Sequence, residues 1–203
     1  MSKEYQVSFE IAGVAAMFTR PDSGAAQISY PAPTYSAAKG MFESVARYTS
    51  AYICPTKVEI CKPIQFHKYV TNYGGPLRKN NQRSKGASYQ MPATILVDVC
   101  YRIYGIIKTV SAAPNGNNHL HALQEIFRRR LKKGQCYYMP CLGWKEFVPS
   151  YMGTLRKDTK IEESINQILP SMLYSVFDSP INGKAKPTYR QNVEILEGVL
   201  KYD

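Results

Sequence analysis

The sequence predicts an α+β fold, in which one antiparallel β-sheet is backed by two helices. Hydrophobic residues alternate with a period of two in several segments, as on half-buried strands. In two other segments they recur every three or four residues, as on the buried side of a helix. The 203 residues are 44% hydrophobic, which is enough for one sizeable core. We therefore expect residues 1–203 to form a single domain.

The first half of this domain is expected to run from strand to helix to strand. Residues 5–11 alternate between apolar and polar side chains and predict the first strand. Two prolines then break the chain, and Thr34 is a typical N-cap for a helix over residues 35–48. Alternation returns over residues 57–66, which predicts a second strand.

The second half is expected to repeat this order. Residues 94–109 are rich in β-branched and aromatic side chains and predict a long third strand. A helix follows over residues 120–133, with Gly134 as its stop. A fourth strand is expected over residues 136–147, interrupted by a glycine. The order β-α-β-β-α-β is that of a ferredoxin-like or RRM-type core. Residues 148–203 are expected to form a C-terminal β elaboration, with strands at 171–177 and 193–202.

Positive charge is the strongest functional signal in the sequence. The chain carries 26 Lys and Arg against 15 Asp and Glu, a net charge of +11. Five of the six residues at 128–133 are basic, and residues 60–97 contain no acidic residue. Such cations attract a polyanion and supply the sequence-independent part of its binding. A lone charge run is also typical of a solvated helix face, so the rest of the chain must decide.

Residues 67–93 are too long and too polar for an ordinary connection, and we expect them to form a basic projection. Its expected RNA contacts are Arg78, Lys79, Arg83 and Lys85. Several of the 16 tyrosines lie inside basic segments, where their rings can stack on unpaired bases. The combination favours RNA or single-stranded DNA as the ligand.

Other functional classes find little support. The sequence has no P-loop and no GxSxG elbow, and its few acidic residues do not cluster as a two-metal nuclease requires. Five cysteines without CxxC spacing predict neither disulfides nor a zinc site, and we expect no metal or cofactor. We expect a cytoplasmic protein with no membrane contact, since there is no long apolar run or signal peptide. A stand-alone RNA-binding module, such as a ribosome-associated protein, remains an alternative.

Several blocks in the first 150 residues resemble, in order, the CRISPR-associated protein five family, nearest to its type I-C branch. These blocks are residues 16–21, 28–44, 62–66, 127–130, 133–136 and 142–147. The resemblance implies a repeat-associated RNA-binding subunit that holds the 5′ handle of the guide RNA (crRNA) in a type I CRISPR antiviral surveillance complex. Residues 67–93 would be the thumb of the family. The implied partners are the crRNA, a repeated backbone subunit, a large subunit and, indirectly, target DNA.

Other RNA contacts are expected in or near the matching blocks and the basic helix end. They are Arg20, Tyr30, Lys39, Arg129, Arg130 and Lys133. These residue types suit contacts with phosphates and bases. Tyr30 is equally compatible with a role in strand packing.

The type I-C branch also cuts precursor crRNA without metal, using a Tyr after the first helix and a Lys-His pair at the start of the second. In this chain those positions read Ala46, Ala122 and Leu123. None of these side chains can move a proton or stabilise a developing charge. We therefore expect a binding subunit that lacks the family's processing activity.

The alternative is a metal-independent endoribonuclease whose catalytic residues have moved. Tyr48 lies two residues beyond the expected position, and His119 and His121 lie at the start of the second predicted helix. A histidine pKa of about 6.5 suits acid-base chemistry near neutrality. Both histidines could approach one RNA only if they lie in a loop, and histidines in such loops are more often idle than catalytic.

Overall fold

One long strand, β5 (Tyr89–Thr109), is the centre of a mostly antiparallel sheet. The computed structural model describes residues 4–24, 26–73, 80, 89–112, 118–176 and 186–202. Within these residues β5 pairs with β1 (Gln6–Ala16) on one side and with β3 (Ala51–Ile60) on the other. The strand order is β6 (Tyr151–Gly153), β1, β5, β3, β9 (Val199–Lys201), β8 (Thr188–Leu196) and β7 (Gln167–Ser175).

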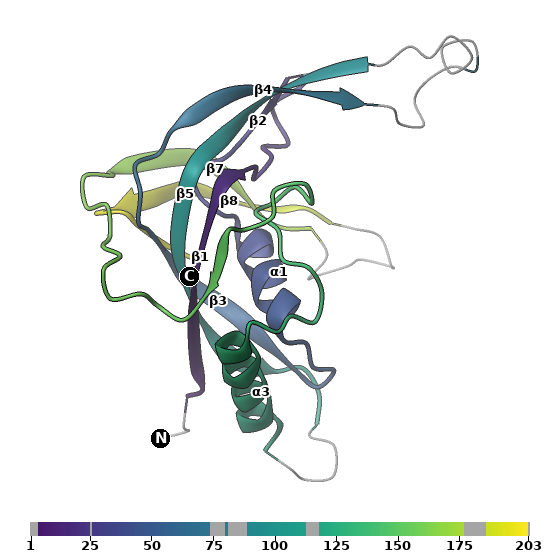
Figure 1. The fold of residues 1–203 in the computed structure, drawn as a ribbon, viewed down its shortest axis with the longest axis vertical. Coiled ribbons are helices and arrows are strands. Elements are labelled where there is room, and N and C mark those ends of the chain that lie inside the picture. The colour runs from purple at the N-terminus through teal and green to yellow at the C-terminus, as the bar shows by residue number, and fades with distance from the viewer. Residues whose placement is uncertain are drawn as a thin grey trace.

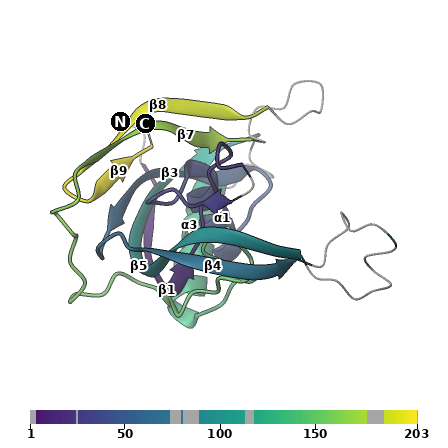
Figure 2. The ribbon, with the colours of Figure 1, turned by 90° about the horizontal axis from the view of Figure 1, so that it is seen from above.

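The first part of β5 leaves the main sheet and forms a two-stranded arm with β4 (Phe66–Tyr73). The short strand β2 (Gln27–Ile28) also pairs with β5 near the base of this arm. Figure 2 shows the arm extending away from the body of the protein. It is the described part of the predicted projection. The four cations expected there, Arg78, Lys79, Arg83 and Lys85, lie outside the described residues.

The two helices among the described residues, α1 (Tyr35–Val45) and α3 (His119–Lys133), lie on the same face of the sheet (Figure 1). The predicted caps are confirmed. The Thr34 side chain accepts a hydrogen bond from the amide of Ala37 at 3.2 Å, and Gly134 ends α3 in the left-handed conformation with φ 64°. Neither helix among the described residues is long and apolar enough to cross a membrane.

Three aromatic rings hold the helices to the sheet. Phe9 of β1, Phe42 of α1 and Phe127 of α3 are fully buried. The ring centroids of Phe9 and Phe42 are 4.9 Å apart, and those of Phe42 and Phe127 are 5.6 Å apart. Aromatic pairs of this kind contribute about 0.5–1.5 kcal/mol beyond the area that they bury. Both helices pack on this cluster, so no helix among the described residues covers the opposite face of the sheet.

The boundaries of the first helix and second strand differ from the prediction. Helix α1 ends at Val45 because Ala46 adopts an extended conformation, with φ −146° and ψ 130°. The expected helix end at residue 48 is therefore wrong. Strand β3 begins at Ala51 and ends at Ile60, so residues 57–66 do not form one strand.

The expected fourth strand over residues 136–147 is also wrong, since this segment is a loop. The loop packs against the end of β1, where the amide of Met17 donates to the carbonyl of Leu142 at 2.9 Å. Gly143 lies so close to the Met17 carbonyl oxygen that a Cβ would overlap it, and its φ is 88°. Strand β6 takes the fourth position beside β1 instead.

The predicted strand over residues 193–202 is divided into β8 and β9. Glu197 and Gly198 between them have φ values of 48° and 74°. Two consecutive residues with positive φ are typical of the tight turn of a β-hairpin. Apolar residues on both sides of this turn gave the sequence the appearance of one continuous strand.

Glu10 of β1 is a fully buried carboxylate that fastens the segment after β6 to the sheet. It accepts hydrogen bonds from Arg156 Nε at 2.5 Å, from the Arg156 amide at 3.0 Å and from Thr159 Oγ1 at 2.8 Å. Arg102 Nε lies 3.4 Å from Glu10 Oε2, the oxygen that also accepts from the Arg156 amide. Burial alone would raise the pKa of Glu10, but hydrogen bonds from Arg156 and Thr159 outweigh it and lower the pKa.

Replacing Glu10 with Ala is expected to lower the free energy of unfolding by about 3 kcal/mol or more, because Arg102 and Arg156 lose their shared counter-charge. Urea denaturation measures the loss. The exposed Glu194 provides the control, and its replacement with Ala should change the value by less than about 0.5 kcal/mol. A loss for Glu10→Ala as small as that of the control would contradict this role.

The same interaction should depend on pH. The folded-state pKa of Glu10 is below the ordinary value of 4.5, so its stabilisation is complete above that value and is lost as the pH falls through the folded-state pKa. The difference in unfolding free energy between wild type and Glu10→Gln should therefore shrink as the pH falls below 4.5.

Candidate nucleic-acid interface

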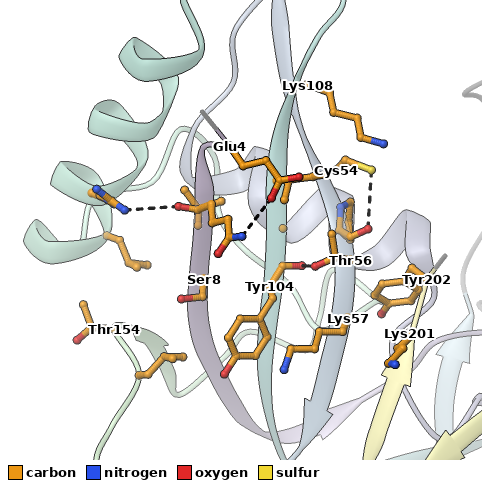
Figure 3. Close-up of a pocket in the computed structure, with 18 of the residues that line it drawn as sticks. Glu4, Ser8, Cys54, Thr56, Lys57, Tyr104, Lys108, Thr154, Lys201 and Tyr202 are labelled. Atoms are coloured by element: carbon orange, nitrogen blue, oxygen red, sulfur yellow. Dashed lines mark hydrogen bonds between the residues drawn. The ribbon is translucent and has the colours of Figure 1, made fainter. Parts of the chain in front are cut away.

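A groove of about 1300 Å³ crosses the sheet over β1, β5 and β3 (Figure 3). Side chains alternate between the two faces of a strand, so Ser8 points away from the helices because its neighbour Phe9 packs on α1. Tyr104 likewise lies on the face opposite to that of the buried Ile103. The floor of the groove is therefore the sheet face that the helices leave uncovered. The end of α3 and strand β9 line its sides.

Most charged side chains that line the groove are basic. They are Lys57, Lys108, Arg128, Lys132, Arg190 and Lys201. Among the described lining residues the one carboxylate is Glu4. A concave surface with this excess of one charge concentrates a ligand of the opposite charge and speeds its association. The groove therefore suits a polyanion.

The centre of the groove combines a flat ring with a cation. Lys57 Nζ lies 4.3 Å from the centroid of the Tyr104 ring and 2.6 Å from Glu59 Oε1. The Tyr104 hydroxyl donates to Glu59 Oε2 at 2.9 Å. Burial, and then the Glu59 carboxylate, raise the pKa of Tyr104 to about 12. Tyr104 is therefore uncharged at neutral pH and adds no negative charge to the groove.

A second cavity, of about 480 Å³, lies beside the end of α1. Its lining includes Ala46 and Leu123, two of the three positions at which the family resemblance implies catalytic groups. Tyr48 lines the same cavity, together with Lys39 and Arg47. The buried Ala46 and Leu123 give this cavity apolar walls where proton-transfer groups were implied.

The structure does not bring the alternative catalytic residues together. His119 and His121 lie in the first turn of α3 and not in the loop that this alternative requires. His119 is buried, and its Nε2 lies 3.3 Å from Thr109 Oγ1. His121 is exposed, and its Nε2 lies 4.0 Å from Glu125 Oε1. Among the described residues that line the cavity of Tyr48, neither histidine occurs.

Two of the RNA contacts expected from the sequence already have partners within the protein. The guanidinium of Arg20 binds both carboxylate oxygens of Asp22, at 2.7 and 3.1 Å. Tyr30 is 3% exposed, and its hydroxyl accepts a hydrogen bond from the Leu173 amide at 3.0 Å. The Tyr30 ring therefore packs in the core, which agrees with the strand-packing interpretation of this residue.

The basic end of α3 divides between two surfaces. Arg128 and Lys132 line the groove, whereas Arg129 and Lys133 are exposed and are not among its lining residues. Arg130 turns toward α1 and donates to the Val45 carbonyl at 3.0 Å. The sequence located this cationic segment, but it did not show which of its side chains share a surface with the sheet.

None of the six basic residues of the groove was among the RNA contacts expected from the sequence. Arg128 and Lys132 belong to the basic run 128–133, and the other four, Lys57, Lys108, Arg190 and Lys201, lie outside it. Lys57 and Lys201 lie opposite each other in the pairing of β3 with β9. This pairing joins segments far apart in the chain, so charge counts along the sequence could not reveal it.

Comparison with known proteins identifies the family. The family model described as "CRISPR-associated protein (Cas_Cas5)" matches residues 7–175. This chain belongs to the Cas5d family of CRISPR-associated proteins. The resemblance found in the sequence is thus confirmed.

Two curated relatives are named "CRISPR pre-crRNA endoribonuclease Cas5d". The relative from Mannheimia succiniciproducens is 28% identical and is covered over 84% of each chain. The relative from Thermus thermophilus is 26% identical over 92% of this chain and 80% of its own length. The match therefore spans most of each protein.

Solved structures share the fold at low sequence identity. A crystal structure of a CRISPR-associated protein has a TM-score of 0.69 at 18% identity and covers 100% of this chain and 95% of its own. A functionally uncharacterized protein from Streptococcus mutans has a TM-score of 0.68 at 16% identity, covering 98% and 92%. A chain of a CRISPR RNA-guided surveillance complex has a TM-score of 0.56 at 16% identity, covering 98% and 90%. The predicted α+β class, a large antiparallel sheet with two helices, is confirmed.

Proposed function

We propose that this Cas5d-family protein binds the 5′ handle of crRNA as a scaffold subunit of a type I CRISPR surveillance complex. The observation that carries the proposal is the basic groove over the uncovered sheet face. Single-stranded nucleic acid binds where cations follow its backbone and flat rings lie beside its bases. Lys57 lies over the Tyr104 ring at the centre of the groove and provides such a pair, although its ammonium also pairs with Glu59, and Lys201 lies opposite it on β9.

The order of the core strands supports a ferredoxin-like interpretation. Strands β6, β1, β5 and β3 are neighbours in that order, and each pair is antiparallel. With α1 between β1 and β3 and α3 between β5 and β6, this is the arrangement of a ferredoxin-like core. RNA-binding domains of this type use the face opposite the helices. In this proposal β7, β8 and β9 are the C-terminal elaboration, and the arm of β4 and β5 is the base of a thumb.

The handle-binding subunit is proposed to lack processing activity. Ala46, Ala122 and Leu123 occupy the positions of the implied catalytic groups. None of these side chains can activate a ribose hydroxyl or protonate a leaving group. The complex would supply a repeated backbone subunit and a large subunit as neighbours, and target DNA would be contacted through the crRNA.

A second candidate function is metal-independent cleavage of precursor crRNA. It is favoured by the names of the two curated relatives, both described as endoribonucleases. Its residues would be Tyr48, His119 and His121. Tyr48 shares a cavity with the cations of Lys39 and Arg47, which outnumber the one carboxylate among its described lining residues, that of Glu43, and so support an anionic ligand.

The double variant Lys57→Gln/Lys201→Gln is expected to bind RNA carrying the CRISPR repeat more weakly than wild type. For each phosphate that is no longer neutralised, the slope of log affinity against log salt concentration should fall by about 0.7 to 1. Fluorescence anisotropy titrations at several salt concentrations measure both quantities. The matched control replaces Lys160 and Lys186, two exposed lysines outside the groove, and should leave them unchanged. Equal affinity of the groove variant and the control would overturn the assignment of the groove.

Incubation of the protein with the same RNA in EDTA separates the two candidate functions. The scaffold proposal predicts tight binding with no cleavage, since the implied catalytic positions cannot transfer protons. Gel analysis of end-labelled RNA measures the products. Site-specific cleavage that disappears in Tyr48→Phe and in His119→Ala/His121→Ala would contradict the scaffold proposal and support the second candidate.

A further inference from the structure

We propose that Tyr137, in the loop after α3, is a stacking platform for an unpaired base of the bound RNA. This inference rests on the proposed RNA-binding function and adds a contact surface outside the groove. The ligand is one nucleotide of a single-stranded RNA whose neighbouring nucleotides lie in the groove. Stacking tolerates any base, so the platform contributes affinity rather than sequence specificity.

The loop after α3 exposes a run of large apolar side chains. Tyr137 is 58% exposed, Tyr138 is 43% exposed and Met139 is 71% exposed. Contiguous exposed apolar surface of this kind marks an interaction site more often than isolated exposed residues do. The aromatic rings make this surface suitable for a flat partner.

Hydrogen bonds hold the backbone of this loop against α1. The amides of Tyr137 and Tyr138 both donate to the Ser44 carbonyl, at 2.7 and 3.2 Å. The Tyr138 hydroxyl donates to the Gly40 carbonyl at 3.0 Å. A ring on a fixed backbone loses little conformational entropy when a base stacks on it. The loop therefore presents Tyr137 in a preorganised position.

The charge around Tyr137 favours a phosphate backbone. The guanidinium carbon of Arg130 lies 5.9 Å from the centroid of the Tyr137 ring. At the neighbouring Tyr138, burial and then the Glu43 carboxylate raise the pKa, while Arg47 lowers it.

The end of α3 lies between the groove and this platform. Arg128 and Lys132 line the groove, whereas Arg130 faces Tyr137. Arg129 and Lys133 are exposed on the same two turns of helix. An RNA strand that leaves the groove across this helix end would meet cations on its phosphates and then the ring of Tyr137. The cationic segment would thus connect two parts of one binding surface.

The test uses a single-stranded 12-nucleotide oligoadenylate with one 2-aminopurine base, whose fluorescence is quenched by stacking. Tyr137→Ala is expected to weaken binding by about 5- to 100-fold and to reduce the quenching, while Tyr137→Phe keeps both. The salt dependence of binding should not change in Tyr137→Ala, because the substitution removes no cation. The matched control is Tyr189→Ala, which removes a ring on β8 that is 45% exposed. Thermal melting confirms that each variant is folded.

The outcomes separate the platform from the proposed function. If Tyr137→Ala binds like wild type while Lys57→Gln/Lys201→Gln binds more weakly, the platform is wrong and the groove assignment stands. If Tyr137→Phe loses as much affinity as Tyr137→Ala, the hydroxyl carries the effect and stacking is contradicted. If wild type does not bind the oligonucleotide and does not bind the repeat RNA, both proposals fail.

Discussion

The rest of the structure depends on a row of three charged residues across the sheet, in which Arg102 pairs with Glu10, while Glu59 is held by Lys57 and Tyr104. Arg102 of β5 lies opposite Glu10 of β1 on one side and opposite Glu59 of β3 on the other. Both carboxylates are buried, at 0% and 5% exposure. A shift of one residue in either pairing would turn the carboxylates toward the apolar helix face, where they would lack these partners. The row therefore fixes the register of the three central strands.

That register determines which face of the sheet meets the helices and which face meets a ligand. With Glu10 and Glu59 on one face, Phe9 falls on the other, where it packs against Phe42 and Phe127. The uncovered face then carries Tyr104, whose hydroxyl is bound by Glu59, and Lys57, which lies over its ring. Residues that stabilise the sheet thus also position the ring and the cation at the centre of the groove.

The sequence predicted much of the fold because most of its signals are local. The cap at Thr34, the stop at Gly134 and the apolar composition of β5 are readable from a few neighbouring residues. The segment 136–147 was mistaken for a strand because its aromatic residues suit a sheet, whereas the backbone of Gly143 packs on Met17 instead.

The groove was only partly predicted, for a related reason. The cations of α3 form one dense run in the sequence, but Lys57 and Lys201 become neighbours through the pairing of β3 with β9. The tight turn at Gly198 joins β8 to β9, and its carbonyl accepts a hydrogen bond from the Ile60 amide at the end of β3. Charge that is brought together by non-local pairing leaves no pattern in the sequence.

The central claim is that RNA lies on the uncovered sheet face, and photochemical cross-linking tests it most directly. Repeat RNA would be irradiated in complex with the wild-type protein, and the cross-linked residues would be identified by mass spectrometry. If RNA lies on this face, adducts form on Tyr104 and on peptides that contain Lys57 or Lys201, all of which line the groove. Adducts confined to residues outside the groove, such as Tyr189 of β8, would contradict it.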